Sequence, residues 1–146
     1  MKQGILKSEF CKWQVLAIVF ATMFYTGCNG FTKTDLAQSV QSFNEKSLPQ
    51  KQAEGLVWTS LTYDMVLDQV VFKYTFDEDY FDVEEMLPLF YENKNEMKNQ
   101  IAPLIAEQGK KMKLNGSSVK IKYEFNRSKK SFDIIFSSEE IDQLIK

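Results

Sequence analysis

Histidine is absent from the 146 residues of this chain, and no other feature of the composition limits its chemistry as much. Histidine is the usual general base and the commonest zinc ligand, and Ser-His-Asp and Cys-His catalysis both depend on it. Cysteine is scarce too, since Cys11 and Cys28 are the only two. The sequence therefore predicts a protein that is not an enzyme and that holds neither a metal nor a cofactor.

The chain begins with the pattern of a secretory signal peptide. Lys2, Lys7 and Lys12 precede an apolar run from Val15 to Tyr25, and small residues follow it. That run is shorter than the roughly 20 apolar residues that a membrane-spanning helix requires. The pattern therefore indicates an exported protein.

Four residues where the leader meets the rest of the chain indicate a lipid-modified exported protein. Tyr25-Thr26-Gly27-Cys28 resembles the lipobox of bacterial lipoproteins, in which Leu, a small residue, and Gly or Ala precede a Cys; Tyr25 stands here in place of Leu. The resemblance implies that Cys28 receives a diacylglyceryl group and that residues 1–27 are removed. It also implies a lipid-anchored protein of the cell envelope, and Asn29, where an Asp would retain the protein, favours the outer membrane. Plain secretion without a lipid is the alternative.

The remainder of the chain is long enough for one domain. Residues 28–34 are predicted to form a polar tether, and residues 35–146 a single domain that has no cysteine and therefore depends on its apolar core. The net charge of −2 argues against nucleic acid or an anionic surface as the main partner, because both require a basic face on the protein.

Hydrophobic periodicity predicts a helix followed by a hairpin in the first half. Leu36, Val40 and Phe43 share one helical face, with Thr34 or Asp35 as the cap and Leu48-Pro49 as the end. Strands are expected over 56–63, with Val57, Leu61 and Tyr63 on one face, and over 70–76, where apolar residues alternate with others.

A long helix is predicted next, over 83–114. Asp82 and Glu85 form the sequence of a capping box at its start, and Asn115-Gly116 supplies its end. Pro103 removes a backbone hydrogen bond, so a kink is expected near Gln100-Ile101.

A second hairpin, over 119–125 and 132–136, and a short helix capped by Ser137 complete the domain. The expected fold is α+β with two layers: a four-stranded antiparallel sheet of two hairpins with helices on one face, in the order α-β-β-α-β-β-α. The stretch from Leu48-Pro49 through Asp64 and on through VVFKYTFDED resembles small bacterial proteins without an assigned activity. That resemblance implies a fold outline and no sites.

The acidic stretch DEDYFDVEE invites two functional hypotheses. Asp77, Asp79 and Asp82 are oxygen ligands at close spacing, as calcium prefers, but no loop glycine or bidentate Glu accompanies them. Capping of the following helix is the favoured interpretation. The alternative class is a small envelope hydrolase in which Asp77, Asp79 or Glu85 supplies paired carboxylates.

The tip of the first hairpin is the candidate contact site. Met65, Val66 and Leu67 occupy a turn where Gly, Asn, Asp or Pro are usual. Either the strand pairing continues and buries Val66, which is the favoured interpretation, or the tip contacts a partner. The leading prediction is a non-catalytic, membrane-anchored module that binds a protein or a small apolar molecule. A periplasmic inhibitor or immunity protein is a further alternative.

Overall fold

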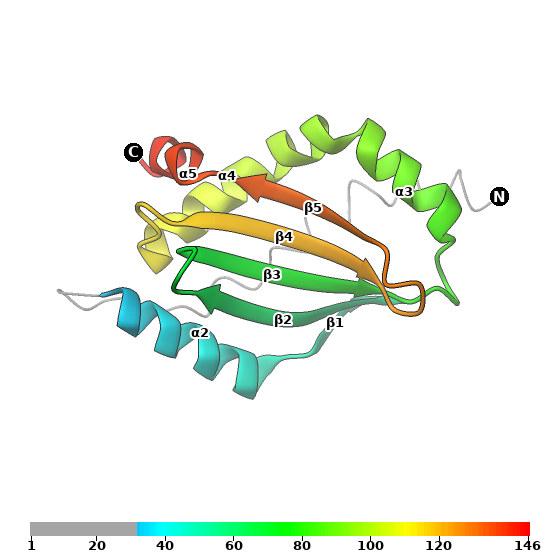
Figure 1. Ribbon diagram of the computed structural model, residues 1–146, viewed down its shortest axis with the longest axis horizontal. Coiled ribbons are helices and arrows are strands. Elements are labelled where there is room, and N and C mark those ends of the chain that lie inside the picture. Colours follow the sequence, from blue (N-terminus) through cyan, green and yellow to red (C-terminus); the bar gives the residue numbers. More distant parts are fainter. Residues whose placement is uncertain (1–31) are drawn as a thin grey trace.

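The computed structural model describes residues 32–146, so the leader and Cys28 lie outside the described part. Over these residues, a five-stranded sheet has its strands side by side in sequence order, and four helices accompany it (Figure 1). The elements are α2 (Lys33–Ser47), β1 (Gln50–Ala53), β2 (Leu56–Asp64), β3 (Gln69–Phe76), α3 (Val83–Glu92), α4 (Lys94–Met112), β4 (Ser118–Phe125), β5 (Ser131–Phe136) and α5 (Ser138–Leu144).

The α+β class is confirmed, but the expected four-stranded antiparallel sheet is wrong in two respects. The additional strand is β1, whose residues QKQA show no apolar alternation that the sequence pattern could reveal. In addition, β3 and β4 are parallel. The reason is the crossover: α3 and α4 return the chain along the length of the sheet, so β4 starts beside the start of β3.

Helix boundaries differ from the prediction at the start of the domain and in its middle. Thr32 caps α2 in a capping box with Asp35, so the helix begins at Lys33. The expected long helix is two helices that meet at Asn93, and Pro103 lies inside the second of them; the kink near Gln100-Ile101 stays a prediction. At this break the Asn93 side chain donates a hydrogen bond to the Leu89 carbonyl at 2.7 Å, as an Asn that ends a helix can do.

A β-bulge changes which residues of β2 face the core. The register with β3 shifts between Trp58 and Ser60, so Leu56 and Trp58 are buried before the bulge and Leu61 after it. The extra residue reverses the alternation. Val57 therefore lies on the opposite face from Leu61, contrary to the prediction.

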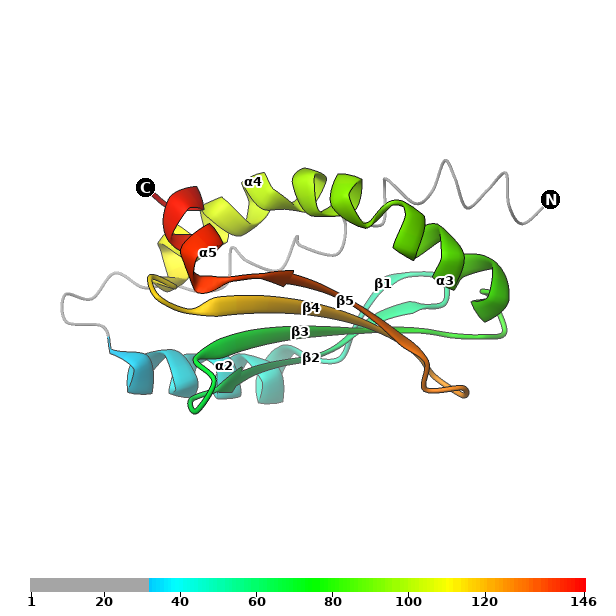
Figure 2. The same ribbon diagram turned by 45° about the horizontal axis from the view of Figure 1, so that its top comes forward.

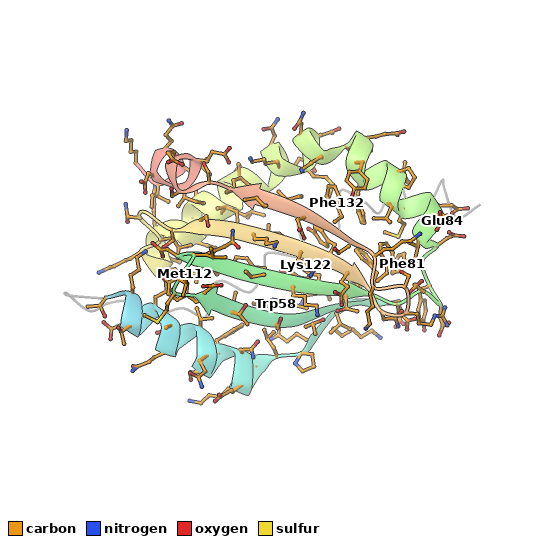
Figure 3. The ribbon with its side chains drawn as sticks, viewed as in Figure 1. Trp58, Phe81, Glu84, Met112, Lys122 and Phe132 are labelled. Atoms are coloured by element: carbon orange, nitrogen blue, oxygen red, sulfur yellow. The ribbon has the colours of Figure 1, made fainter. Side chains whose placement is uncertain are left out.

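The core is an aromatic layer between the sheet and the helices. Phe76 lies within 5.6 Å, ring centre to ring centre, of Phe81, Phe90 and Phe125. Phe81 is 7% exposed and belongs to this core. In Figure 3 the buried side chains Met112, Trp58 and Phe81 lie toward one end, near the middle and toward the other end of the sheet, so the core extends along its length.

Within the described residues, the helices do not cover one face of the sheet, nor part of the outer edge of β2. α2 lies along the β2 side and α3 and α4 along the β5 side (Figure 2). Beyond the end of β1, the Asn44 side chain accepts a hydrogen bond from Leu61 N–H at 2.8 Å, which pairs one backbone group on the free edge of β2. The other face carries charged residues such as Lys122, which lies 3.8 Å from Glu124.

Candidate functional site

The turn between β2 and β3 presents three adjacent apolar side chains to solvent. Met65 is 58% exposed, Val66 94% and Leu67 67%. Strand pairing ends at Asp64 and resumes at Gln69. The interpretation that Val66 is buried is therefore wrong, and we call Met65, Val66 and Leu67 the apolar tip.

Two aspartates explain why this turn needs no glycine. Asp64 Oδ1 accepts hydrogen bonds from the backbone N–H groups of Val66 at 2.9 Å and Leu67 at 3.0 Å. Asp68 takes the left-handed conformation that closes the turn, with φ of 49°. Aspartate satisfies turn amides and tolerates this conformation, so the apolar side chains remain free to point outward.

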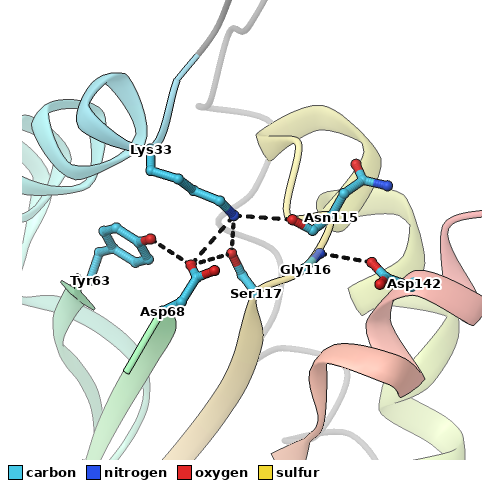
Figure 4. A network of polar contacts seen from close by, with 7 residues as sticks. All are labelled: Lys33, Tyr63, Asp68, Asn115, Gly116, Ser117 and Asp142. Carbon is cyan, nitrogen blue, oxygen red and sulfur yellow. Dashed lines mark hydrogen bonds and ion pairs between the residues drawn. The ribbon is translucent and has the colours of Figure 1, made fainter. Parts of the chain in front are cut away.

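Behind the tip, the Asp68 carboxylate is the centre of a polar network (Figure 4). Its Oδ1 accepts hydrogen bonds from the Tyr63 hydroxyl and, at 2.7 Å, from the Ser117 hydroxyl. The same oxygen lies 3.4 Å from Lys33 Nζ, which also donates to the Asn115 carbonyl at 3.1 Å. The network therefore joins the start of α2, the β2–β3 turn and the loop before β4.

The electrostatics of the network favour a charged Asp68 and a neutral Tyr63. Burial acts to raise the pKa of Asp68, but hydrogen bonds from Tyr63 and Ser117, together with the Lys33 charge, hold that pKa below its ordinary value. Burial, and then the hydrogen bond and charge of Asp68, raise the pKa of Tyr63 to about 12. At neutral pH the network therefore keeps one negative and one positive charge in contact.

This network fixes where the chain enters the domain. Lys33 is the first residue of α2, and its contact with Asp68 places the helix start at the same end of the molecule as the apolar tip. Figure 1 and Figure 2 both show the α2 start and the β2–β3 turn at one end of the sheet. The predicted lipid site, Cys28, is only a few residues upstream of this point.

At the opposite end, the acidic stretch connects two loops. Asp77 Oδ1 accepts from Asp79 N–H at 2.9 Å and from Asn126 Nδ2 at 3.3 Å, and Asp79 pairs with Arg127 at 2.9 Å. Glu78 Oε2 accepts hydrogen bonds from the backbone N–H groups of Arg127 and Ser128 in the β4–β5 turn. These bonds, and the one from Ser128 most of all, lower the pKa of Glu78. Each of these carboxylates therefore binds atoms of the two loops.

Asp82 caps α3 as predicted, but the Glu85 side chain does not complete the expected capping box, and its Oε2 is buried without a hydrogen-bond partner among the described residues. Asp82 Oδ1 accepts from the N–H groups of Glu84 at 2.9 Å and Glu85 at 3.3 Å. Ser137 caps α5 in the same way, through Glu140 N–H at 3.2 Å. Within residues 32–146, no group of three or more His, Cys, Asp or Glu side chains is arranged to hold a metal ion.

The sequence pattern indicated the apolar tip but not the network behind it. Lys33, Asp68 and Ser117 are common residue types with no motif spacing, and they come from separate parts of the chain. The one available signal was the pair Asp64 and Asp68 on either side of the tip, which is typical of a closed turn.

The domain shares its fold with a protein described as secreted. A crystal structure of that protein, from Pseudomonas aeruginosa, aligns with a TM-score of 0.56 and 8% identity over 78% of this chain and 99% of the other. A pilotin from the Vibrio vulnificus type 2 secretion system aligns with a TM-score of 0.41 and 13% identity, over 73% of this chain and 87% of the other. The chain matches no protein-family model and no curated protein by sequence. In the described part, no helix combines the length and the apolar character that a membrane crossing requires.

Proposed function

We propose that this chain is a lipid-anchored protein of the bacterial cell envelope that acts by binding and not by catalysis. The observation that carries the proposal is the apolar tip, which is exposed at the end of the fold where the chain arrives from Cys28. Exposed apolar side chains that adjoin one another are typical of a contact surface, whereas single ones are ordinary.

The anchor is proposed from the leader. A lipobox-like sequence directly follows a short apolar run, and Cys28 is the one thiol at the cleavage position. A diacylglyceryl group and an acylated amino terminus together give lasting attachment, since each buried methylene contributes about 0.8 kcal/mol. The domain then operates at a membrane surface and not in free solution.

The preference for binding over catalysis is supported by the use that the fold makes of its acids. Asp77 and Asp79, two of the acids that a hydrolase of this sequence would employ, are engaged by Asn126 and Arg127. Paired glycosidase carboxylates instead face each other across a cleft, about 5–9.5 Å apart. Stabilising two loops is a sufficient role for these two residues.

The anchor is tested by metabolic labelling with an alkyne fatty acid in a diderm bacterial host. The parent chain is expected to take up label, and C28S is expected to lose it and to keep its leader. C11S is the matched control, because it removes the other thiol and should label like the parent. Equal label in the parent and in C28S would overturn the lipoprotein proposal.

Sorting between the inner and the outer membrane is tested at Asn29, the residue after Cys28. With Asn29 the lipidated protein is expected in the outer-membrane fraction of a density gradient, and N29D is expected to shift it toward the inner membrane. Recovery of both forms in the inner membrane would contradict the proposed location while leaving the anchor itself in place.

A further inference from the structure

We infer that the apolar tip contacts the bilayer that holds the lipid anchor, so that Met65, Val66 and Leu67 form a second attachment point for the domain. This inference rests on the proposed anchor for its geometry. It goes beyond the anchor because it assigns a lipid surface, and not a protein, as the partner of the tip.

The covalent reach of the tether is the first argument. Five residues, 28–32, separate the start of α2 from the leader, and an extended chain of that length spans at most about 18 Å. By contrast, α2 has 15 residues and is therefore about 22 Å long. The end of the domain at which α2 starts is therefore the end held closest to the lipid headgroups.

The contact between Lys33 and Asp68 is the second argument. Lys33 Nζ lies 3.4 Å from Asp68 Oδ1, and Asp68 directly follows Leu67. The tip cannot turn away from the helix start without breaking this ion pair and the hydrogen bond from Ser117 to the same carboxylate. The fold therefore keeps the tip and the entry point of the chain on one surface.

The chemistry of the tip fits the boundary between headgroups and acyl chains. Interfacial segments bury apolar side chains to a depth of roughly 5–10 Å while cationic side chains remain among the headgroups. The amides of Val66 and Leu67 are already bonded to Asp64, so their transfer to a less polar medium leaves neither without a partner.

The charges around the tip agree with this placement. Lys110 and Lys113 are exposed at the end of α4, close to Asn115, whose carbonyl accepts from Lys33. The neighbouring carboxylates are engaged within the fold: Asp64 by the turn amides, Asp68 by the network, and Asp142 by Gly116 N–H at 2.8 Å. The end that carries the tip therefore presents lysines to lipid phosphates beside carboxylates that the fold already binds.

The test places a fluorophore at each end of the lipidated protein. Residue 66 precedes β3 and residue 80 follows it, and Tyr80 is 54% exposed, so V66C and Y80C form a matched pair at opposite ends of one strand. Each full-length precursor is expressed, lipidated, labelled with an environment-sensitive dye and reconstituted into phosphatidylethanolamine–phosphatidylglycerol vesicles. Some vesicles carry a spin-labelled quencher on the acyl chains.

The label at residue 66 is expected to shift to shorter wavelength and to be quenched several-fold more strongly than the label at residue 80. Equal quenching at the two positions would overturn the inference. So would a photo-reactive amino acid at residue 66 that captures a protein, and no lipid, in intact cells.

Mass spectrometry of the same samples separates this result from the anchor. If Cys28 carries its lipid and residue 66 is not quenched, the anchor stands and the tip inference fails. If Cys28 is unmodified, the anchor proposal fails, and quenching at residue 66 on addition of vesicles still supports a tip that binds lipid. Absence of both signals overturns both.

Discussion

Phe72 of β3 and Ile121 of β4 lie directly opposite each other across the parallel pair, and each side chain is only 1% exposed. Both strands lie in the interior of the sheet, because β2 flanks β3 and β5 flanks β4. The hairpin β2–β3 and the hairpin β4–β5 therefore meet at this contact. Its loss weakens the connection between the two halves of the domain.

Truncation of either residue is expected to destabilise the domain strongly. F72A and I121A should each reduce the free energy of unfolding by about 2–5 kcal/mol, because a large buried side chain is removed and a cavity remains. Urea denaturation followed by circular dichroism measures the change. K122A, on the opposite face of the same strand, is the control and should cost less than about 1 kcal/mol. Losses below that level at both core positions would contradict the facing of β3 and β4.

Gly55 and Gly116 allow backbone strain to be separated from a steric clash. Both have positive φ, 78° and 79°, but a Cβ at Gly55 would lie 2.7 Å from Tyr80 Cβ, whereas one at Gly116 has nothing within 4 Å. G116A should therefore cost about 1–2 kcal/mol from the left-handed conformation alone. G55A should cost about 1–3 kcal/mol more, because overpacking is added. Equal losses in the two variants would show that the β1–β2 turn yields freely.

Acid is expected to weaken the Asp68 network. Since the folded-state pKa of Asp68 lies below its unfolded value of about 3.9, the network stabilises the fold above that pH and loses its effect as the pH falls through the folded value. D68N tolerates the positive φ but removes the charge, so it should lose roughly 1 kcal/mol at pH 7.

Stability measured from pH 7 down to pH 3 distinguishes this effect from a packing defect. The difference between the parent and D68N should shrink as the pH falls through the acid range. S117A, which removes one donor and keeps the carboxylate, is the control and should retain most of the pH dependence of the parent. A constant difference at every pH would show that the Asp68 charge contributes nothing.

Charges placed on the apolar tip should alter attachment and not folding. M65D/L67D changes two exposed side chains, so its free energy of unfolding should stay within about 0.5 kcal/mol of the parent. Lipid quenching of a label at residue 66 should fall sharply in this background. S128D, in the exposed turn at the far end of the sheet, is the control and should leave quenching unchanged. A marked drop in melting temperature for M65D/L67D would mean that the tip supports the core.

Local sequence determined those features that depend on near neighbours. The caps at Asp82 and Ser137 and the apolar alternation of β3 and β4 involve residues a few positions apart, so one-dimensional patterns predicted them. The sequence showed three consecutive apolar residues between the two strands. It did not show that they are exposed, because a local pattern cannot show whether strand pairing continues past Asp64.

Tertiary structure alone decided the features that join distant segments. The parallel pairing of β3 with β4 depends on where the crossover helices return the chain, and β1 forms because β2 offers it an edge. The contact between Lys33 and Asp68 likewise unites two unremarkable residues far apart in the sequence. Hydrogen bonds and apolar burial act between groups that are neighbours in space. Only folding therefore decided that the tip and the start of α2 lie at the same end of the domain.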